Sequence, residues 1–191
     1  MQQPDLLVPA RDEAIHRLFF ALSPDAALRR QIADVSLQLE REQAPGGRRL
    51  EPHRYHLTLQ FLGDFQPLRP SVVDAARQAA DTIQLPAFEL NLDHAGSFPG
   101  SNVWWLGTHG VAPGLQALWD ALGVALARAG VQVKLSQRFA PHLTIRRDVR
   151  RQIEPLALEP LRWTVRDFVL FDSMPGEPYE VLHRRRLLDA Q

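Results

Sequence analysis

A four-residue pattern of histidine, leucine, threonine and an aliphatic residue occurs twice in this chain and limits its possible folds more than any other feature. It stands in RYHLTLQFLG, residues 54–63, and again in APHLTIRRDV, residues 140–149, with the histidines 142 − 56 = 86 positions apart. Side chains i and i+2 of a strand lie on the same face. Each copy therefore predicts a strand with an aliphatic pair facing a core and a polar pair facing the other way: His56 with Thr58, and His142 with Thr144.

The segments that precede the two motifs repeat in the same order. RLFFAL, residues 17–22, has the composition of a buried strand, and VWWLG, residues 103–107, stands at a matching position, because Trp104 follows Phe19 by 104 − 19 = 85 residues. A strand, a helix and a histidine strand thus occur twice, which predicts two related lobes.

Apolar residues three and four positions apart predict an amphipathic helix after each of these opening strands. The first helix is expected over 24–42, with Ser23 as its N-cap, and the second is expected from Pro113 to a stop at Gly130. A third helix is expected over 71–83. The tail predicts two further strands, one in LRWTVRDFVLFDS and one in YEVLHRRRLL. We therefore expect an α+β fold in which residues 14–191 form one two-lobed domain, after a polar lead-in over residues 1–13.

The composition excludes several classes of function. Lys+Arg and Asp+Glu balance at 22 each, which disfavours a surface that coats long nucleic acids by charge alone, although a small basic site remains possible. The chain has no cysteine, which excludes thiolate metal sites and a cysteine nucleophile. The N-terminus lacks a signal-peptide pattern and no apolar run reaches membrane-spanning length, so we expect a cytoplasmic protein.

Two histidine strands that face each other would bring two imidazoles and two hydroxyls together. Histidine titrates near neutral pH, so one imidazole can accept a proton from a nucleophile while the other donates one to a leaving group. Threonine hydroxyls can hydrogen-bond phosphate oxygens, and arginines supply the counter-charge. Arginines cluster beside both motifs, at positions 48, 49, 54, 146, 147, 150 and 151. A single copy of the motif is more often structural than catalytic; the duplication indicates a functional site.

These residues resemble the motifs of the 2H phosphoesterases, and within them the LigT-like bacterial RNA 2′,3′-cyclic phosphodiesterases, also called the 2′-5′ RNA ligase family. YHLTLQFLG and PHLTIRR match the paired HxTx motifs, and the segments RLFFAL, GSFP…VWWLG and FVLFDS…YEVL are similar to the rest of the family pattern. The resemblance covers nearly the whole chain. It implies a two-lobed LigT-like fold, in which pseudo-twofold related antiparallel sheets line a central cleft and the helices lie outside.

The resemblance also implies an activity: the metal-independent hydrolysis of RNA or nucleoside 2′,3′-cyclic phosphates to 2′-phosphomonoesters. His56 would be the general acid that protonates the departing 3′ oxygen, and His142 would be the base that activates water. Thr58 and Thr144 would hold the phosphate oxygens. The family uses no metal or cofactor, and we expect a monomer without a membrane partner.

Two further site residues follow from the resemblance with less precision. The family's arginine corresponds to Arg147, but strand parity favours Arg146, because Arg147 reaches the cleft only if the strand bulges or ends. We prefer Arg147 and leave Arg146 open. Phe98, in GSFPG, matches the family's aromatic residue that stacks on a nucleobase. A loop phenylalanine that fills the core is an equal alternative.

Other functions remain open from the sequence alone. The same fold could act on another cyclic phosphate, such as a cyclic ADP-ribose phosphate, or on 2′-5′ linkages, including RNA ligation. A non-catalytic module that binds RNA ends is a third possibility, which the intact His/Thr pairs disfavour. The other histidines, at positions 16, 53, 94, 109 and 183, have no threonine partner and are interpreted as structural, with His53 a candidate for the cleft rim.

Overall fold

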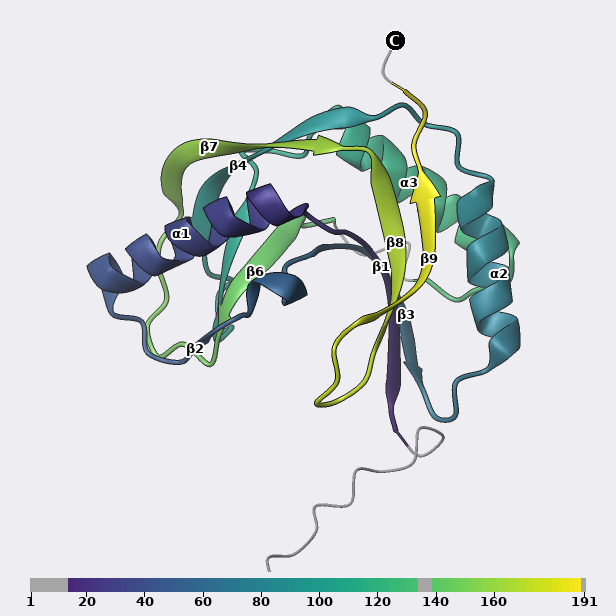
Figure 1. Cartoon of the computed structure of the whole chain (residues 1–191), viewed down its shortest axis with the longest axis horizontal. Helices are drawn as coiled ribbons and strands as arrows, with labels where there is room; N and C mark the ends of the chain where they lie inside the picture. The colour runs from purple at the N-terminus through teal and green to yellow at the C-terminus, as the bar shows by residue number, and fades with distance from the viewer. Residues whose placement is uncertain (1–13, 134–138, 190–191) are drawn as a thin grey trace, which may run out of the picture.

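The computed structural model describes residues 14–133 and 139–189, in which nine strands form one sheet and three α-helices cover it (Figure 1). The expected lead-in over residues 1–13 lies outside this part. The strands are β1 (His16–Leu22), β2 (Arg48–Arg49), β3 (Leu57–Phe65), β4 (Phe88–Gly96), β5 (Val103–Gly107), β6 (His142–Arg147), β7 (Leu156–Val165), β8 (Asp167–Ser173) and β9 (Glu180–Arg186). The helices are α1 (Ala26–Gln43), α2 (Pro70–Asp81), α3 (Pro113–Arg128) and a short 3₁₀ turn, η2 (Pro52–Arg54).

The sheet consists of two related halves joined edge to edge. Its strand order is β7-β4-β5-β6-β3-β1-β8-β9, with β2 attached to β6, and the named strands pair antiparallel. The two histidine strands β3 and β6 meet at the centre, where Leu57 pairs with Leu143. Outward from this point β1 corresponds to β5, since each precedes a helix and a histidine strand. The α+β class and the duplicated unit are therefore confirmed.

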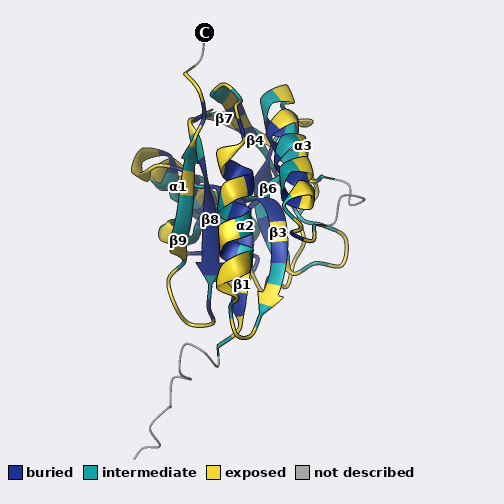
Figure 2. Cartoon of the chain, turned by 90° about the vertical axis from the view of Figure 1, so that its right-hand side faces the viewer, coloured by how far each residue is buried: buried dark blue, intermediate teal, exposed yellow. Residues whose placement is uncertain are grey.

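The helices bury the apolar face of this sheet and tie its halves together. Helix α1, from the first repeat, packs against β6 and β7 of the second half of the sheet. Helix α3, from the second repeat, packs against β3 of the first half and also against β4 and α2. Each of these two helices therefore contacts the half of the sheet that contains the other histidine strand. Figure 2 shows α2 with exposed residues on its outer side and buried strands behind it. Helix α1 begins after Asp25, whose carboxylate accepts a 2.8 Å hydrogen bond from the backbone N–H of Leu28; the expected cap, Ser23, instead accepts one from Arg29.

The tail contains three strands, and the prediction of two was wrong. The segment LRWTVRDFVLFDS breaks at Arg166: β7 pairs with β4 at one end of the sheet, and β8 pairs with β1 in the other half. The segment has neither glycine nor proline at this point, so the sequence offers no turn signal there. None of the helices in the described part of the chain combines the length and apolar character needed to cross a bilayer.

Candidate active site

The two motifs meet on one face of the sheet. Leu57, Leu59, Leu143 and Ile145 are buried at 3% exposure or less, on the helix-covered face. The pairing of Leu57 with Leu143 places His56 beside Thr144 and His142 beside Thr58. These four side chains lie on the opposite, concave face, because the residues before and after a paired residue in a strand point to the other side of the sheet. The structure therefore brings together the four side chains that the sequence predicts, two from each half.

Each imidazole is held in the same way. Nδ1 of His56 lies 2.8 Å from the carbonyl oxygen of Arg54, and Nδ1 of His142 lies 2.8 Å from the carbonyl oxygen of Ala140. A carbonyl oxygen can only accept, so both Nδ1 atoms carry a proton. In the neutral ring, Nε2 therefore keeps a lone pair that can accept a proton, and in the charged ring it can donate one.

The surroundings of the two rings differ. The His56 ring lies among aromatic side chains from three separate segments, with ring centroids 5.0 Å from Phe19, 6.4 Å from Phe171 and 5.3 Å from Tyr179. The His142 ring has an edge-to-face contact with Phe98 at 4.8 Å. Sequence reasoning did not identify the three aromatic neighbours of His56 as site residues, because the fold alone brings β1, β8 and the β8–β9 loop to this point.

This environment favours neutral imidazoles. Burial lowers the pKa of His56 to about 4, and the nearby positive charges of Arg147, His142 and Arg54 act in the same direction, against the hydrogen bond to the Arg54 carbonyl. Burial also lowers the pKa of His142, as does Arg147, while the Ala140 carbonyl opposes the shift. The charge of Arg147 thus acts on both histidines.

A β-bulge places the two candidate arginines on opposite faces of the sheet. Thr144 pairs with Trp105 and Arg146 with Trp104, so Ile145 is an extra residue in β6, and the alternation of faces resets there. Arg146 consequently points to the helix side, where it is 5% exposed, forms an ion pair with Glu40 and donates hydrogen bonds to the carbonyls of Gly46 and Gly47.

The same bulge returns Arg147 to the concave face, where it is exposed. It has no carboxylate within ion-pair distance among the described residues. The structure therefore places Arg147 on the same face as the two histidines, whereas Arg146 is held by Glu40 and by backbone carbonyls on the other face.

The bulge recurs in β3 and reveals an asymmetry. Leu59 is the extra residue there, and Gln60 points to the helix side, where its amide donates to the Trp119 carbonyl of α3. Phe61, which is 45% exposed, occupies the position that matches Arg147, since 147 − 61 = 86. Of these two matching positions, one therefore carries a cation and the other an exposed phenylalanine.

The loop of Phe98 packs at the site and not in the core. Phe98 lies 5.3 Å from the ring of Trp105, which covers Gly96 and Gly107. A Cβ added at Gly96 would lie 2.6 Å from the Trp105 ring, so this close approach requires glycine. Trp104, the neighbouring residue, is in the core, and its indole donates to the Arg151 carbonyl. Of the two interpretations of Phe98, its position beside His142 favours contact with a ligand.

The remaining histidines lie in other surroundings. His16, His94 and His183 each contact an aspartate, at 2.6, 2.7 and 2.9 Å, and the ring of His109 lies tilted against that of His94, with centroids 5.0 Å apart. His53 is exposed and lines a groove beside the site. Among residues 14–133 and 139–189, no group of three or more histidine and carboxylate side chains is arranged to hold a metal ion.

Comparisons with known proteins agree with this arrangement. A family model described as the 2′-5′ RNA ligase superfamily matches residues 24–176, a range that contains both histidine strands, Phe98 and Arg147. The RNA 2′,3′-cyclic phosphodiesterase of Escherichia coli (strain K12) is 32% identical over 161 residues, which are 82% of this chain and 86% of that protein. A protein of the same name from Aquifex aeolicus (strain VF5) is 33% identical over 102 residues, covering 52% of this chain and 54% of its own.

A solved structure is similar over almost the full length. The crystal structure of E. coli LigT complexed with 3′-AMP has a TM-score of 0.76 with this chain, and that of E. coli LigT in apo form has a TM-score of 0.74. In the 3′-AMP complex the identity is 30%, and the match covers 91% of this chain and 98% of that one.

Proposed function

Because this chain belongs to the 2′-5′ RNA ligase superfamily, we propose that it hydrolyses RNA or nucleoside 2′,3′-cyclic phosphates to 2′-phosphomonoesters without a metal. The observation that carries this proposal is the matched pair of imidazoles, each fixed through Nδ1 to a backbone carbonyl and each leaving Nε2 for proton transfer. We further propose that the protein acts as a monomer, since one chain supplies both halves of the site.

In this mechanism the two histidines have opposite tasks. Neutral His142 accepts a proton from water through Nε2 as the water attacks phosphorus, and charged His56 donates its Nε2 proton to the departing 3′ oxygen. The bond from phosphorus to the 3′ oxygen breaks, and the phosphate remains on the 2′ oxygen. Thr58 and Thr144 donate hydrogen bonds to the non-bridging oxygens, and Arg147 balances the negative charge that develops in the transition state.

Because both histidine pKa values are lowered, His56 becomes charged only when the substrate raises its pKa. With a pKa of about 4, His56 is neutral in the free protein at neutral pH. A negative phosphate between the rings favours their charged forms and raises both pKa values. Binding therefore increases the fraction of protein in which His56 is charged, and a proton that the aromatic surroundings disfavour is readily given to the leaving oxygen.

The test is hydrolysis of a nucleoside 2′,3′-cyclic phosphate in EDTA, with the product isomer identified by phosphorus NMR. We expect the 2′-phosphate, with a rate that EDTA does not change. A matched control is His183→Ala, which removes a histidine that contacts Asp81 outside the site and should leave the rate unchanged. A 3′-phosphate product, or a rate that vanishes in EDTA and returns with a divalent cation, would refute the proposal.

A further inference from the structure

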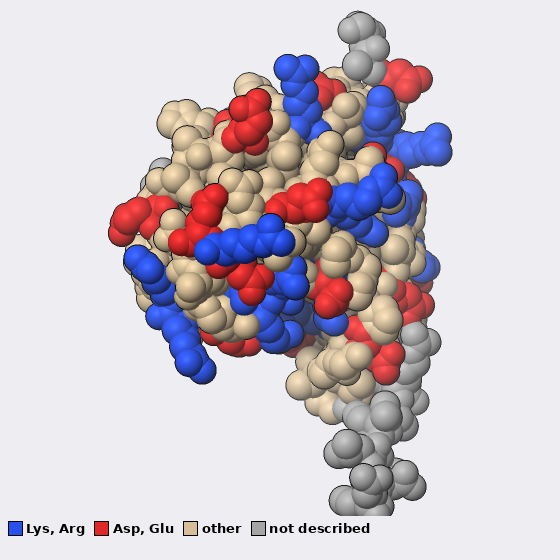
Figure 3. Space-filling model, turned by 60° about the vertical axis from the view of Figure 1, so that its left-hand side comes forward, with Lys and Arg blue, Asp and Glu red and all other residues tan. Residues whose placement is uncertain are grey.

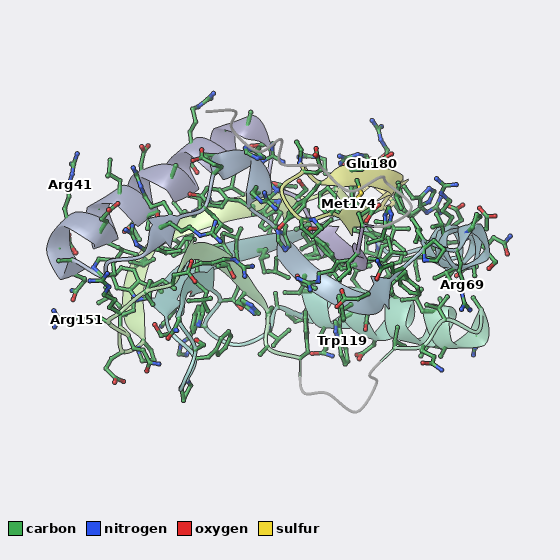
Figure 4. The ribbon with its side chains drawn as sticks, turned by 90° about the horizontal axis from the view of Figure 1, so that it is seen from below. Arg41, Arg69, Trp119, Arg151, Met174 and Glu180 are labelled. Carbon is green, nitrogen blue, oxygen red and sulfur yellow. The ribbon has the colours of Figure 1, made fainter. Side chains whose placement is uncertain are left out.

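An arginine-lined groove opens beside the two histidines. It has a volume of ≈ 720 Å³ and lies between the β8–β9 loop and the segment that contains β2 and η2. The arginines that line it are Arg17, Arg48, Arg49, Arg54 and Arg147. Among the described residues that line the groove, one carboxylate is present, on Glu51. Met174, labelled in Figure 4, belongs to the groove wall on the β8–β9 side.

Two residues connect this groove to the site. Tyr179 lines the groove, and its ring is also 5.3 Å from the His56 ring. Arg147 lines the groove as well, and its charge lowers the pKa of both His56 and His142. The groove therefore adjoins the space beside the two histidines.

The charges in the groove are partly balanced. Arg17, Arg48 and Arg49 have carboxylate partners, which are Asp64 at 2.9 Å, Asp148 at 3.0 Å and Glu40 at 3.1 Å. In the described part of the chain, Arg54 and Arg147 have none within ion-pair distance. The Arg54 guanidinium lies 4.7 Å from the centre of the Tyr179 ring, which orders the side chain and leaves its N–H donors for another ligand.

The surface of the protein is not uniformly basic. Arginines and carboxylates are interspersed over the face drawn in Figure 3, in keeping with the formal net charge of zero. On the His142 side of the site the neighbours are aromatic, Phe98 and Trp105. The two sides thus suit different parts of a nucleotide: a base on the aromatic side, and further phosphate on the arginine side.

We propose that this groove binds the phosphodiester on the 5′ side of the nucleotide that carries the cyclic phosphate, with Arg54 as the residue that contacts it. This inference rests on the proposed function and names the residues that contact a second phosphate of the substrate. A single strand carries one phosphate per nucleotide, so the 5′ phosphodiester is the charge nearest to the cyclic phosphate. Arg54 contacts this phosphodiester, and Arg48 and Arg49 attract the next phosphates of the chain.

The test compares three substrates with the same terminal base: adenosine 2′,3′-cyclic phosphate, its 5′-(methyl phosphate) derivative, and a tetranucleotide that ends in adenosine 2′,3′-cyclic phosphate. For the wild type we expect kcat/KM to rise roughly ten- to hundredfold when the 5′ phosphodiester is added, the usual effect of a charge-assisted contact. Arg54→Gln should remove most of this preference and Arg48→Gln a smaller part. Because each preference is a ratio within one variant, any effect of Arg54 on the pKa of His56 cancels.

Arg69→Gln is the matched control, because Arg69 is exposed at the start of α2, away from Met174 in Figure 4, and it should keep the wild-type ratio. The preference should also weaken with salt, with a logarithmic slope of about −0.7 for each phosphate contact. A wild-type ratio near one, or an unchanged ratio in Arg54→Gln, would overturn the inference.

A binding measurement separates this inference from the proposed function. If no cyclic phosphate is hydrolysed, the proposed function fails, and fluorescence anisotropy with a 3′-phosphorylated tetranucleotide still decides the role of the groove. Tenfold or greater weakening in Arg54→Gln, with unchanged affinity in Arg69→Gln, would support the groove as an RNA site. Equal affinity in Arg54→Gln and the wild type would exclude it.

Discussion

Arg146 and Arg147 are adjacent in sequence, and the bulge at Ile145 predicts that their removal has opposite consequences. Arg146→Met removes the buried partner of Glu40, which keeps only the more exposed Arg49, and leaves the carbonyls of Gly46 and Gly47 without their donor. Loss of one partner of a buried ion pair costs about 3–5 kcal/mol. The Glu40 side chain is 32% exposed, so we expect about 3 kcal/mol or slightly less. In a domain of this size that corresponds to a fall in Tm of roughly 6–12 °C.

Arg147→Met should change the reaction and not the fold. Arg147 is exposed on the concave face, so its loss should alter the free energy of unfolding by less than about 0.5 kcal/mol. Loss of a charged contact to the phosphate should lower kcat/KM roughly ten- to hundredfold. Urea denaturation and steady-state kinetics on both variants measure the two effects separately, and Arg151→Met, an exposed arginine whose carbonyl alone is used in the fold, is the control. If Arg146→Met were the less active and Arg147→Met the less stable variant, the assignment of faces would be wrong.

Three further predictions concern protons and the base. First, both histidine pKa values are lowered, so kcat/KM should be bell-shaped with both limbs below about pH 6.5, and Arg147→Gln should move the limbs to higher pH because it removes a positive charge from both rings. Second, the unfolded chain binds a proton at His56 near pH 6.5 and the folded chain near pH 4, so the free energy of unfolding should fall by up to about 3 kcal/mol as the pH falls through this window; His56→Phe should flatten that part of the dependence in urea titrations. Third, Phe98→Ala should mainly raise KM for nucleotides with large bases, and an equal change for purines and pyrimidines would argue against a stacking role.

The sequence predicts those parts of the site that depend on local periodicity. The alternation within HLTL and HLTI predicts which side chains share a face, and the order of strand, helix and histidine strand predicts that the two motifs correspond. The structure agrees on both points, since His56, Thr58, His142 and Thr144 lie together at the junction of β3 and β6. These features need only the two-residue period of a strand and the repetition of a unit.

The parts that depend on tertiary structure could not be predicted in the same way. The bulges at Leu59 and Ile145 carry no glycine, so the sequence does not indicate where the alternation resets. The aromatic residues around His56 come from segments far apart in the chain, and one of them, Tyr179, belongs to a loop. The pKa of His56 follows from that burial, so neither its direction nor its size could be derived from the motif.

The central claim, that His56 and His142 act together as acid and base on a cyclic phosphate, is tested most directly by kcat measurements on His56→Ala, His142→Ala and the double variant. We expect each single change to lower kcat by about two to four orders of magnitude, the usual contribution of a positioned proton-transfer group. The double variant should be little slower than either single one, because the two groups act as a unit. Full activity in either single variant, or losses that multiply in the double variant, would contradict the account.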